Sequence, residues 1–294
     1  MNIALYSKVV NENNLKTIFH LFRKLQSKKI NTLVHSDFLK LLKEHSDLQD
    51  FELKEFGSCK ELGSNVDFLI SIGGDGTFLD TISLVRDSGI PVLGINTGRL
   101  GFLSNTPNSE IGETIEALYS NNFSIEKRSL LQLDHSKSLF GDDNFALNEV
   151  SLLKKDTSSM IIVHVELDGT HLNSYWTDGL IISTATGSTA YSLSCGGPIL
   201  MPGSGNFVIT PIAPHNLNVR PIVIGDNSVL KLRIEGRSES NLIALDSRSQ
   251  EIKNNEEVTL RKAKHKISIV QLNNHGFIQS LRNKLNWGLD KRNQ

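Results

Sequence analysis

One acidic residue among three glycines has the clearest chemical signature in this 294-residue sequence. The stretch Gly73–Thr77 reads Gly-Gly-Asp-Gly-Thr, follows the apolar segment Val66–Ile72 and precedes apolar residues at helical spacing. This order predicts a buried strand, a sharp turn and the start of an amphipathic helix. Glycine lets the backbone approach another group closely, and the free N–H groups at a helix start bind anions. The stretch is therefore typical of a phosphate-binding site.

Asp75 is an unexpected residue for such a site, because a carboxylate repels phosphate. It would be useful there if it bound a metal ion or took a proton from an attacking hydroxyl group. The alternative is that Asp75 only caps the helix, since Asp is a favoured N-cap residue. No Gly-Lys-Ser/Thr follows, so a Walker A loop is excluded, and the third glycine of the dinucleotide fingerprint is missing.

A second glycine-containing loop, Asn96–Leu103, follows the next apolar segment. Its Arg99 could contact a phosphate, because a guanidinium group binds anions through two parallel hydrogen bonds. A solvated surface arginine is the alternative. Phe102 and its apolar neighbours are expected to pack against the rest of the fold. The two glycines of the loop could simply shape a turn.

Two polar motifs lie further along the chain. Asn148-Glu149 interrupts an apolar context, and by itself it would be typical of a turn. The segment from Asp178 to Ser194 is an apolar strand that runs into a hydroxyl-rich turn around Gly187. One helix cap explains one hydroxyl group. The whole cluster instead suits a polar ligand the size of a ribose or a base, hydrogen-bonded close to the backbone.

The elements that position the first two loops alternate between strand and helix. Strands are expected at Asn2–Ser7, Ile30–His35, Val66–Ile72 and Pro91–Asn96, with helices between them. This order predicts a parallel sheet, whose ligands bind beyond the carboxyl ends of the strands. Both glycine loops lie at such ends. Thr106-Pro107 is typical of an N-cap followed by proline at the first helical position, which predicts a helix to about Tyr119.

After residue 122 the pattern changes to alternation of apolar and polar residues. Asp168-Gly169 predicts a hairpin turn, and further strands are expected at 230–235, 242–245, 258–261 and 267–272. We therefore expect an α/β N-terminal domain with a parallel sheet, residues 1–125, and a β-rich, sandwich-like C-terminal domain, residues 126–276. A last helix within residues 277–294 is expected to pack back on the first domain.

Composition narrows the class of protein. The net charge is −1 and no long basic run occurs, so nucleic acid and membrane surfaces are not expected partners. Cys59 and Cys195 are far apart and form neither a disulfide framework nor a zinc motif. No apolar stretch has the length of a membrane span, and the first residues do not resemble a signal peptide. We expect a cytoplasmic protein.

Taken in order, Gly-Gly-Asp-Gly-Thr, Asn-Glu and Thr-Gly-Ser-Thr-Ala-Tyr resemble the bacterial NAD kinase family over nearly the whole chain. The loop Asn96–Leu103 and the segment Cys195–Leu200 also fit that family. The first motif alone is not specific, because lipid kinases and phosphofructokinases carry similar turns. The combination of the three motifs is specific.

The resemblance implies transfer of the γ-phosphoryl group of ATP to the 2′-hydroxyl of the adenosine ribose of NAD, which gives NADP. It implies ATP as co-substrate, a divalent metal ion such as Mg²⁺ with unknown ligands, and a homo-oligomer, dimer or tetramer. Asp75 matches the family's catalytic base. The implied phosphate-binding residues are Gly73, Gly74, Gly76 and Thr77. The implied NAD-binding residues are Asp75, Gly76, Arg99, Phe102, Asn148, Glu149, Asp178, Thr189, Ala190, Tyr191, Ser192, Leu193 and Ser194.

Three residues depart from the family pattern. Ala185, Trp176 and Arg248 stand where proline, a basic residue and glutamine are usual, so the roles of Trp176 and Arg248 are not predicted. Two other functions stay open: a lipid or sugar kinase with the same turn, and a non-catalytic NAD(P)-binding regulator. The presence of both Asp75 and Glu149 argues against a regulator, since a sensor needs no base at a ribose hydroxyl. The sequence does not decide whether NADH or polyphosphate is used.

Overall fold

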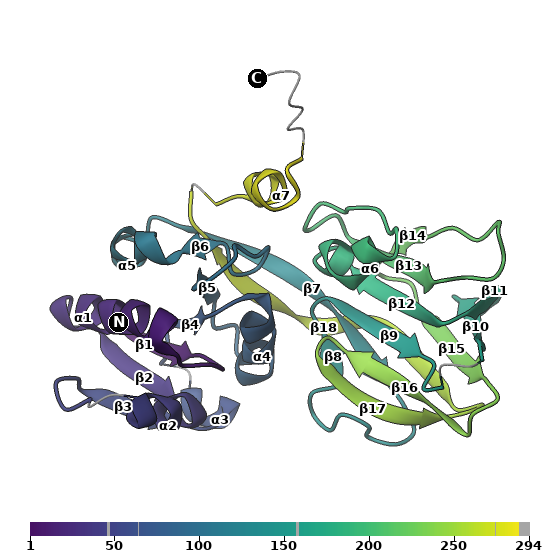
Figure 1. Cartoon of the computed structure of the whole chain (residues 1–294), viewed down its shortest axis with the longest axis horizontal. Coiled ribbons are helices and arrows are strands. Elements are labelled where there is room, and N and C mark those ends of the chain that lie inside the picture. Colours follow the sequence, from purple (N-terminus) through teal and green to yellow (C-terminus); the bar gives the residue numbers. More distant parts are fainter. Residues whose placement is uncertain (46–47, 64, 157–158, 274, 288–294) are drawn as a thin grey trace. The chain divides into compact units, whose positions relative to one another are not determined.

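The computed structural model describes residues 1–45, 48–63, 65–156, 159–273 and 275–287. The chain forms two compact units (Figure 1). Unit 1 comprises Met1–Lys127 and the segment from Ile267 onward, and unit 2 comprises Arg128–Lys266. The chain passes from one unit to the other within two long strands, β7 (Ser124–Asp134) and β18 (Glu257–Gln271).

Unit 1 is built on a parallel sheet with the order β5-β4-β1-β2-β3. Its strands are β1 (Asn2–Tyr6), β2 (Asn31–His35), β3 (Leu53–Phe56), β4 (Phe68–Ile72) and β5 (Val92–Asn96). Every residue of β4 and β5 is buried, as expected for apolar strands covered on both faces. The strand order reverses between β1 and β4, and such a switch point is where open α/β sheets bind ligands. The predicted parallel sheet is confirmed.

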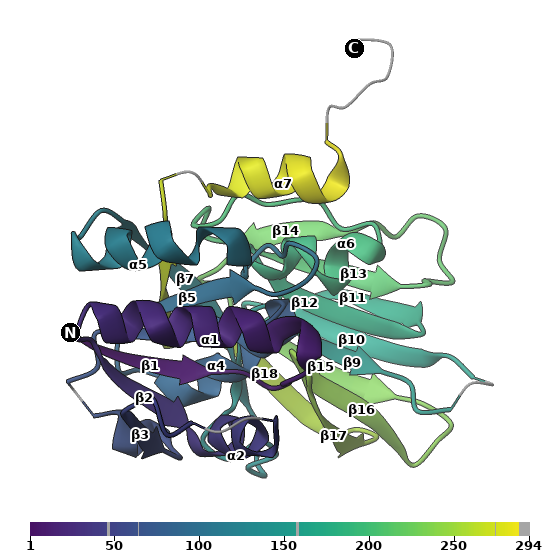
Figure 2. The same ribbon diagram turned by 60° about the vertical axis from the view of Figure 1, so that its left-hand side comes forward.

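The helices of unit 1 follow the expected alternation, and α1 and α5 run side by side (Figure 2). They are α1 (Glu12–Ser27), α2 (Ser36–His45), α3 (Cys59–Leu62), α4 (Asp75–Val85), α5 (Ile111–Tyr119) and α7 (Phe277–Leu285). Helix α1 begins with a reciprocal capping box between Asn11 and Asn14. The expected final helix is α7, which ends at Leu285. The rest of the predicted range, to residue 294, lies mostly outside the described residues.

The helix predicted from Thr106 begins later than expected. Thr106–Pro107 form a short strand, β6, which pairs with β5 opposite Ile95 and Asn96. A 3₁₀ turn, Asn108–Glu110, follows, and α5 begins only at Ile111. Pro107 has extended dihedral angles, φ −67° and ψ 148°, because it pairs with the sheet. Proline is compatible with an edge strand as well as with a helix start, and Pro107 here lies in a strand.

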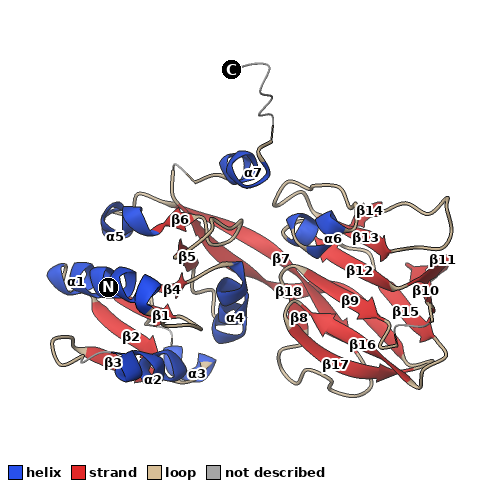
Figure 3. Ribbon diagram, viewed as in Figure 1, coloured by secondary structure: helices blue, strands red, loops and turns tan. Residues whose placement is uncertain are grey.

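Unit 2 consists of two antiparallel sheets, and strands dominate it (Figure 3). One sheet joins β11, β10, β15 and β18, with β7 beside β18 and β8 beside β7; the other has the order β14-β13-β12-β9-β16-β17. The bounds are β8 Phe145–Ala146, β9 Glu149–Leu153, β10 Ile161–Leu167, β11 Thr170–Thr177, β12 Gly179–Thr184, β13 Asn206–Ile212, β14 Ile222–Gly225, β15 Leu230–Glu235, β16 Ser240–Leu245 and β17 Arg248–Lys253.

Buried apolar residues from both sheets form one core, among them Val163 and Val165 of β10 and Leu180 and Ile182 of β12. The predicted β-rich, sandwich-like fold is confirmed. Asp168 and Gly169 both have positive φ in the β10–β11 turn, as a two-residue hairpin requires. The strands predicted separately at 258–261 and 267–272 are one continuous strand, β18.

Within the described residues, no helix is both long enough and apolar enough to cross a membrane.

Candidate active site

The glycine-rich turn joins β4 to α4 at the carboxyl edge of the sheet in unit 1. Gly73 has a φ of 153°, and a Cβ atom there would lie 2.5 Å from the Thr77 hydroxyl oxygen, so only glycine fits. A Cβ atom on Gly74 or Gly76 would meet nothing within 4 Å. The first N–H groups of a helix have no partner inside the helix, and here open space lies beside them. This geometry fits the predicted phosphate-binding turn.

The Asp75 carboxylate turns away from its own helix and binds the next loop. Its Oδ2 accepts a hydrogen bond from the Phe102 N–H at 2.9 Å, and its Oδ1 accepts from Leu103 and Ser104 at 3.0 and 2.9 Å. The N-cap residue of α4 is Gly74, and no side chain caps this helix. The alternative that Asp75 is merely an N-cap is therefore wrong.

Gly101 makes this contact possible. A Cβ atom on Gly101 would lie 1.9 Å from Asp75 Oδ1, so any side chain would push the carboxylate off the loop. Asn96 holds the same loop from the sheet, donating to the Arg99 carbonyl at 2.6 Å and accepting from the Gly98 N–H at 2.7 Å. Arg99 is exposed, and Phe102 is half-buried against Phe277 of α7, with ring centroids 6.0 Å apart.

In unit 2, a second aspartate holds the Asn-Glu motif in the same manner. Asp246, at the turn between β16 and β17, accepts from the Leu147 N–H through Oδ2 at 2.9 Å. Its Oδ1 accepts from the N–H groups of Asn148 and Glu149 at 2.8 and 3.2 Å. Burial raises the pKa of the Asp246 carboxyl, although these hydrogen bonds and Arg248 favour its ionised form.

Arg248, whose role the sequence left open, supports the approach to this motif. Its guanidinium group donates to the carbonyl oxygens of Asp143 and Phe145 and lies 5.8 Å from the centre of the Phe145 ring. In unit 2 it therefore holds the segment that leads into Asn148.

The hydroxyl-rich turn packs directly on the Asn-Glu motif. The Thr184 hydroxyl donates to the Leu147 carbonyl at 2.6 Å, and the Thr184 N–H donates to the Asn148 carbonyl at 2.8 Å. A Cβ atom on Gly187 would lie 2.1 Å from the Asn148 carbonyl oxygen. The glycine of Thr-Gly-Ser-Thr is thus required because two backbones touch there.

Only part of the hydroxyl cluster is available to a ligand. Ser188 and Ser192 are fully buried; Ser188 donates to the Ala185 carbonyl at 2.7 Å, and Ser192 pairs with Thr210 at 2.8 Å. The interpretation that the whole cluster faces a ligand is wrong, because these hydroxyl groups satisfy polar groups inside the turn. Across the short helices Gly187–Thr189 and Tyr191–Ser194, the exposed or half-buried residues are Thr189, Ala190, Tyr191, Leu193 and Ser194.

Glu149 has an unusual environment beside this turn. Burial, and secondly the charge of Asp246, raise the pKa of Glu149 to about 8, while the Tyr191 N–H donates to its carboxylate and acts in the opposite direction. Within the part of the chain that the structure describes, Glu149 Oε2 is buried without a hydrogen-bond partner. Buried polar atoms are nearly always paired, so this oxygen points to a ligand group that completes it.

Asp178 lies elsewhere in unit 2. It precedes β12, whose other end carries the hydroxyl-rich turn, and Ser183 near that end pairs with Glu149. Five residues of strand separate Asp178 from Ser183 by roughly 17 Å. Asp178 forms an ion pair with Lys154 at 2.7 Å. The structure therefore brings together Asn148, Glu149 and the turn, but not Asp178.

Family models settle what these motifs belong to. A model described as the ATP-NAD kinase N-terminal domain matches residues 5–123, and one described as the ATP-NAD kinase C-terminal domain matches residues 147–272. The chain belongs to the ATP-NAD kinase family. The resemblance inferred from the motifs is confirmed.

Curated relatives from this family match over the full length. The NAD kinase of Cytophaga hutchinsonii is 46% identical over 293 residues, covering 100% of both chains, and that of Flavobacterium psychrophilum is 45% identical over 295 residues with the same coverage. The NAD kinase of Bacteroides fragilis (strain ATCC 25285) is 44% identical and covers 99% of this chain and 100% of its own.

Solved structures of more distant members share the fold. Yeast NADH kinase, crystallised with NADH, matches with a TM-score of 0.86 and 24% identity, covering 100% of this chain and 90% of that one. An NAD kinase from Archaeoglobus fulgidus in complex with ATP gives a TM-score of 0.73 and 23% identity, with 97% and 98% coverage.

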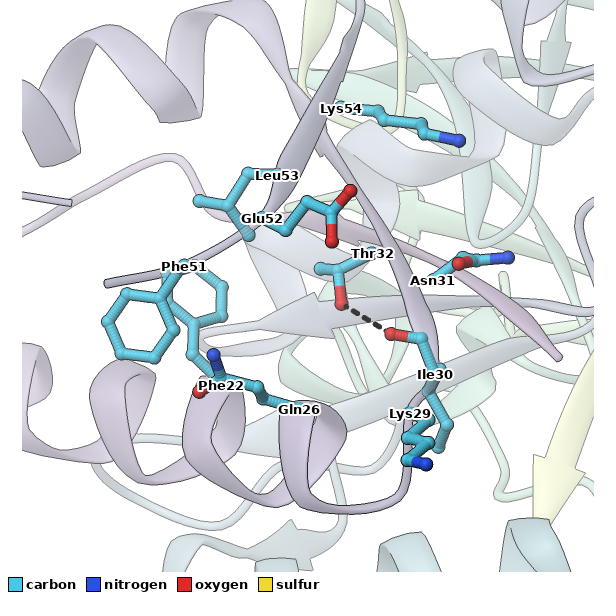
Figure 4. A pocket seen from close by; sticks show the side chains of 10 residues that line it. All are labelled: Phe22, Gln26, Lys29, Ile30, Asn31, Thr32, Phe51, Glu52, Leu53 and Lys54. Atoms are coloured by element: carbon cyan, nitrogen blue, oxygen red, sulfur yellow. Dashed lines mark hydrogen bonds between the residues drawn. The ribbon is translucent and has the colours of Figure 1, made fainter. Parts of the chain in front are cut away.

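Two other features of this ATP-NAD kinase chain stand apart from the motifs. A hollow of about 240 Å³ in unit 1 is lined by residues of α1, β2 and β3 and of the chain between them, including Phe22, Thr32 and Phe51 (Figure 4). None of the motif residues lines it. Among the described residues, no group of three or more His, Cys, Asp and Glu side chains could hold a metal ion.

Proposed function

We propose that the chain transfers the γ-phosphoryl group of ATP to the 2′-hydroxyl of the adenosine ribose of NAD, forming NADP and ADP. The observation that carries the proposal is the full-length similarity to NAD kinases, up to 46% identity in the relatives named above. The geometry agrees, because Asp75 is fixed at an open, phosphate-type turn.

Asp75 is the proposed general base. A ribose hydroxyl is a weak nucleophile, so a carboxylate within hydrogen-bond reach accelerates its attack by accepting its proton. Three backbone N–H groups hold the Asp75 carboxylate in one orientation. It therefore needs no rearrangement of its own when the hydroxyl arrives. Gly73, Gly74, Gly76 and Thr77 surround the phosphates in this proposal, and Arg99 and Phe102 contribute from the second loop.

Asn148 and Glu149 are proposed to hold the adenosine half of NAD. An amide can donate to and accept from adenine, and the unpartnered Glu149 Oε2 can pair with a ribose hydroxyl. Tyr191 supplies an exposed aromatic wall, and its neighbours Thr189, Ala190, Leu193 and Ser194 line the same turn. Ser192 supports them from inside through its bond to Thr210.

We propose Mg²⁺ as the metal ion. In phosphoryl transfer, Mg²⁺ neutralises charge that develops on the phosphate oxygens. It is commonly held by substrate phosphates, waters and one or two carboxylates, so a dedicated protein cage is unnecessary. The absence of such a cage among the described residues fits this role.

We also propose a homo-oligomer, dimer or tetramer. Asp178 matches an NAD-contacting residue of the family, yet it lies at the far end of β12 from Glu149, and every residue of β12 is buried. Because Glu149 and Asp178 lie at opposite ends of this buried strand, we assign Asp178 to NAD held by a second copy. Light scattering after gel filtration tests the oligomer. Mixed Asp75→Asn and Asp178→Ala chains should then regain activity that neither variant has alone.

A cytoplasmic location is proposed because the reaction consumes ATP and NAD.

The central test is direct. Purified protein is incubated with ATP, Mg²⁺ and NAD, and NADP is measured by chromatography, with NADH, diacylglycerol and a sugar phosphate offered in parallel. NADP formation supports the proposal, and preference for a substrate that is not a dinucleotide would overturn it. Binding of NAD without turnover would favour the regulator. Chelation of Mg²⁺ should stop NADP formation while leaving the melting temperature of the protein alone unchanged.

A further inference from the structure

Helix α7 brings a cation to the proposed base. Lys284 Nζ lies 3.4 Å from Asp75 Oδ2 and 4.9 Å from the centre of the Phe102 ring. All three residues belong to unit 1, although 209 positions of sequence separate Lys284 from Asp75. Both side chains of the ion pair keep some exposure, 38% for Lys284 and 28% for Asp75, so the pair is open to a ligand.

Contacts with residues 102–110 of unit 1 fix the position of α7. The Asn105 side chain donates to the His275 carbonyl at 2.7 Å, and His275 Nε2 lies 2.6 Å from Glu110 Oε2. Phe277 packs against Phe102, and Leu281 is buried. Lys284 therefore reaches Asp75 from an anchored helix.

The Lys284–Asp75 contact adds little to what Asp75 already has. The carboxylate has three N–H donors at 2.9 to 3.0 Å, whereas the lysine contact is longer, and partly exposed ion pairs stabilise a fold only weakly. The phosphate chain of ATP or of NAD carries more negative charge in total than one carboxylate, and lysine binds phosphate as a point charge on a flexible stem. The open first turn of α4 begins at Asp75 itself, so phosphate bound there would lie within reach of the Lys284 ammonium group.

We propose that Lys284 binds a phosphate group of the nucleotide, and that it pairs with Asp75 only until that phosphate arrives. This inference rests on the proposed kinase function. When Lys284 moves to the phosphate, the outer side of Asp75 Oδ2 is freed for the ribose hydroxyl, while the three backbone N–H groups keep the carboxylate in place. Lys284 then couples the arrival of nucleotide to the exposure of the base.

Calorimetric binding of ATP alone and of NAD alone tests the proposal without turnover. Lys284→Gln keeps much of the side-chain length and removes the charge, Lys284→Arg keeps the charge, and Arg282→Ala removes another exposed cation of α7. We expect Lys284→Gln to weaken binding about tenfold for the nucleotide whose phosphate it contacts. Lys284→Arg should restore most of the affinity, and Arg282→Ala should bind as the unmodified protein does.

Comparison of the ATP titration with the NAD titration shows whether the phosphate is that of ATP or that of NAD. Adenosine, which has no phosphate, should bind equally to all four proteins. Unchanged affinity of Lys284→Gln for both nucleotides would overturn the inference, and so would an equal loss for adenosine, which would indicate a structural role. If the protein forms NADP but Lys284→Gln binds normally, only this inference fails; if no NADP forms, the proposed function fails independently of these titrations.

Discussion

Asp75 and Asp246 make the same set of hydrogen bonds in two different units. Each accepts one backbone N–H through Oδ2 and two through Oδ1, and the three donors are consecutive residues of a motif loop. Their electrostatic surroundings differ. Asp75 faces the Lys284 ammonium group, whereas Asp246 lies near Glu149, whose pKa it helps raise to about 8. The same hydrogen-bond pattern thus holds a carboxylate beside a cation in unit 1 and a carboxyl group near a second acidic side chain in unit 2.

This difference separates a residue suited to chemistry from one suited to positioning. The Asp75 carboxylate is partly exposed beside an open turn, so a hydroxyl group can approach it. Asp246 shapes the loop that carries Glu149. A hydrogen-bond pattern alone therefore does not distinguish the aspartate that we propose as the base from the one that we propose positions a loop; the groups around each aspartate do.

The largest expected effect is that of Asp75→Asn. The amide oxygen can still accept two of the three N–H groups, so the fold should persist, but no base remains for the ribose hydroxyl. We expect kcat to fall roughly 10²- to 10⁴-fold, measured as NADP formation, with circular dichroism as the check on folding. Near-normal turnover would contradict the assignment of Asp75 as the base, and both aspartates would then only position loops.

The next largest effects are expected from two glycine substitutions, one in each unit, which should change different kinetic constants. Gly101→Ala would displace the Asp75 carboxylate, and Gly187→Ala would displace the Asn148 backbone. Such overpacking commonly costs about 1 to 3 kcal/mol. We expect Gly101→Ala to lower kcat and Gly187→Ala to raise the KM for NAD. Gly98→Ala and Gly225→Ala are matched controls, since a Cβ atom at either meets nothing within 4 Å. Identical kinetic effects of the first two variants would contradict the division of roles.

Asp246→Asn should have a smaller and different effect from Asp75→Asn. Its NH₂ group would face a backbone N–H that needs an acceptor, which should lower the free energy of unfolding by about 1 to 3 kcal/mol. Displacement of Asn148 and Glu149 should raise the KM for NAD about tenfold, while kcat changes less. Urea denaturation and initial rates measure both quantities. A loss of kcat as large as that of Asp75→Asn would show that Asp246 acts in the chemistry.

Within one pH unit, the pH dependence of NAD binding is the smallest effect expected. Below its pKa of about 8, Glu149 must lose a proton before it can accept hydrogen bonds as a carboxylate. NAD affinity should therefore rise with pH, by up to about tenfold per pH unit below the pKa, and level off above it. The unliganded protein should lose stability over the same rise, because its folded state favours the protonated form. Glu149→Gln should flatten both trends in calorimetric titrations and melting curves; a slope that persists would assign them to another group.

Local patterns predicted the motifs and many of the elements of each unit, although not β3, α3 or β13. The runs that became β4 and β5, the Asp168-Gly169 turn and the glycine-rich loops all follow from neighbouring residues. Where pairing with another strand decided the conformation, the prediction was wrong. Thr106–Pro107 joined the sheet instead of starting a helix because β5 pairs with it.

Residues that act across long sequence distances could not be found in this way. Asp246 is 97 to 99 positions from the loop it holds, and Lys284 is 209 positions from Asp75. An Asp beside a turn and a Lys on an amphipathic helix have ordinary local explanations. The hydroxyl cluster misled for a related reason, because Ser188 and Ser192 find their partners, Leu200 and Thr210, only after folding.

The contact between Gly187 and the Asn148 carbonyl also sets a rule for exchanging parts among relatives. Two backbones that touch with no room for a methyl group behave as one module, even though nearly forty positions lie between them in the chain. A chimera that imports residues 147–149 from another family member should work only when residues 184–187 come from the same donor.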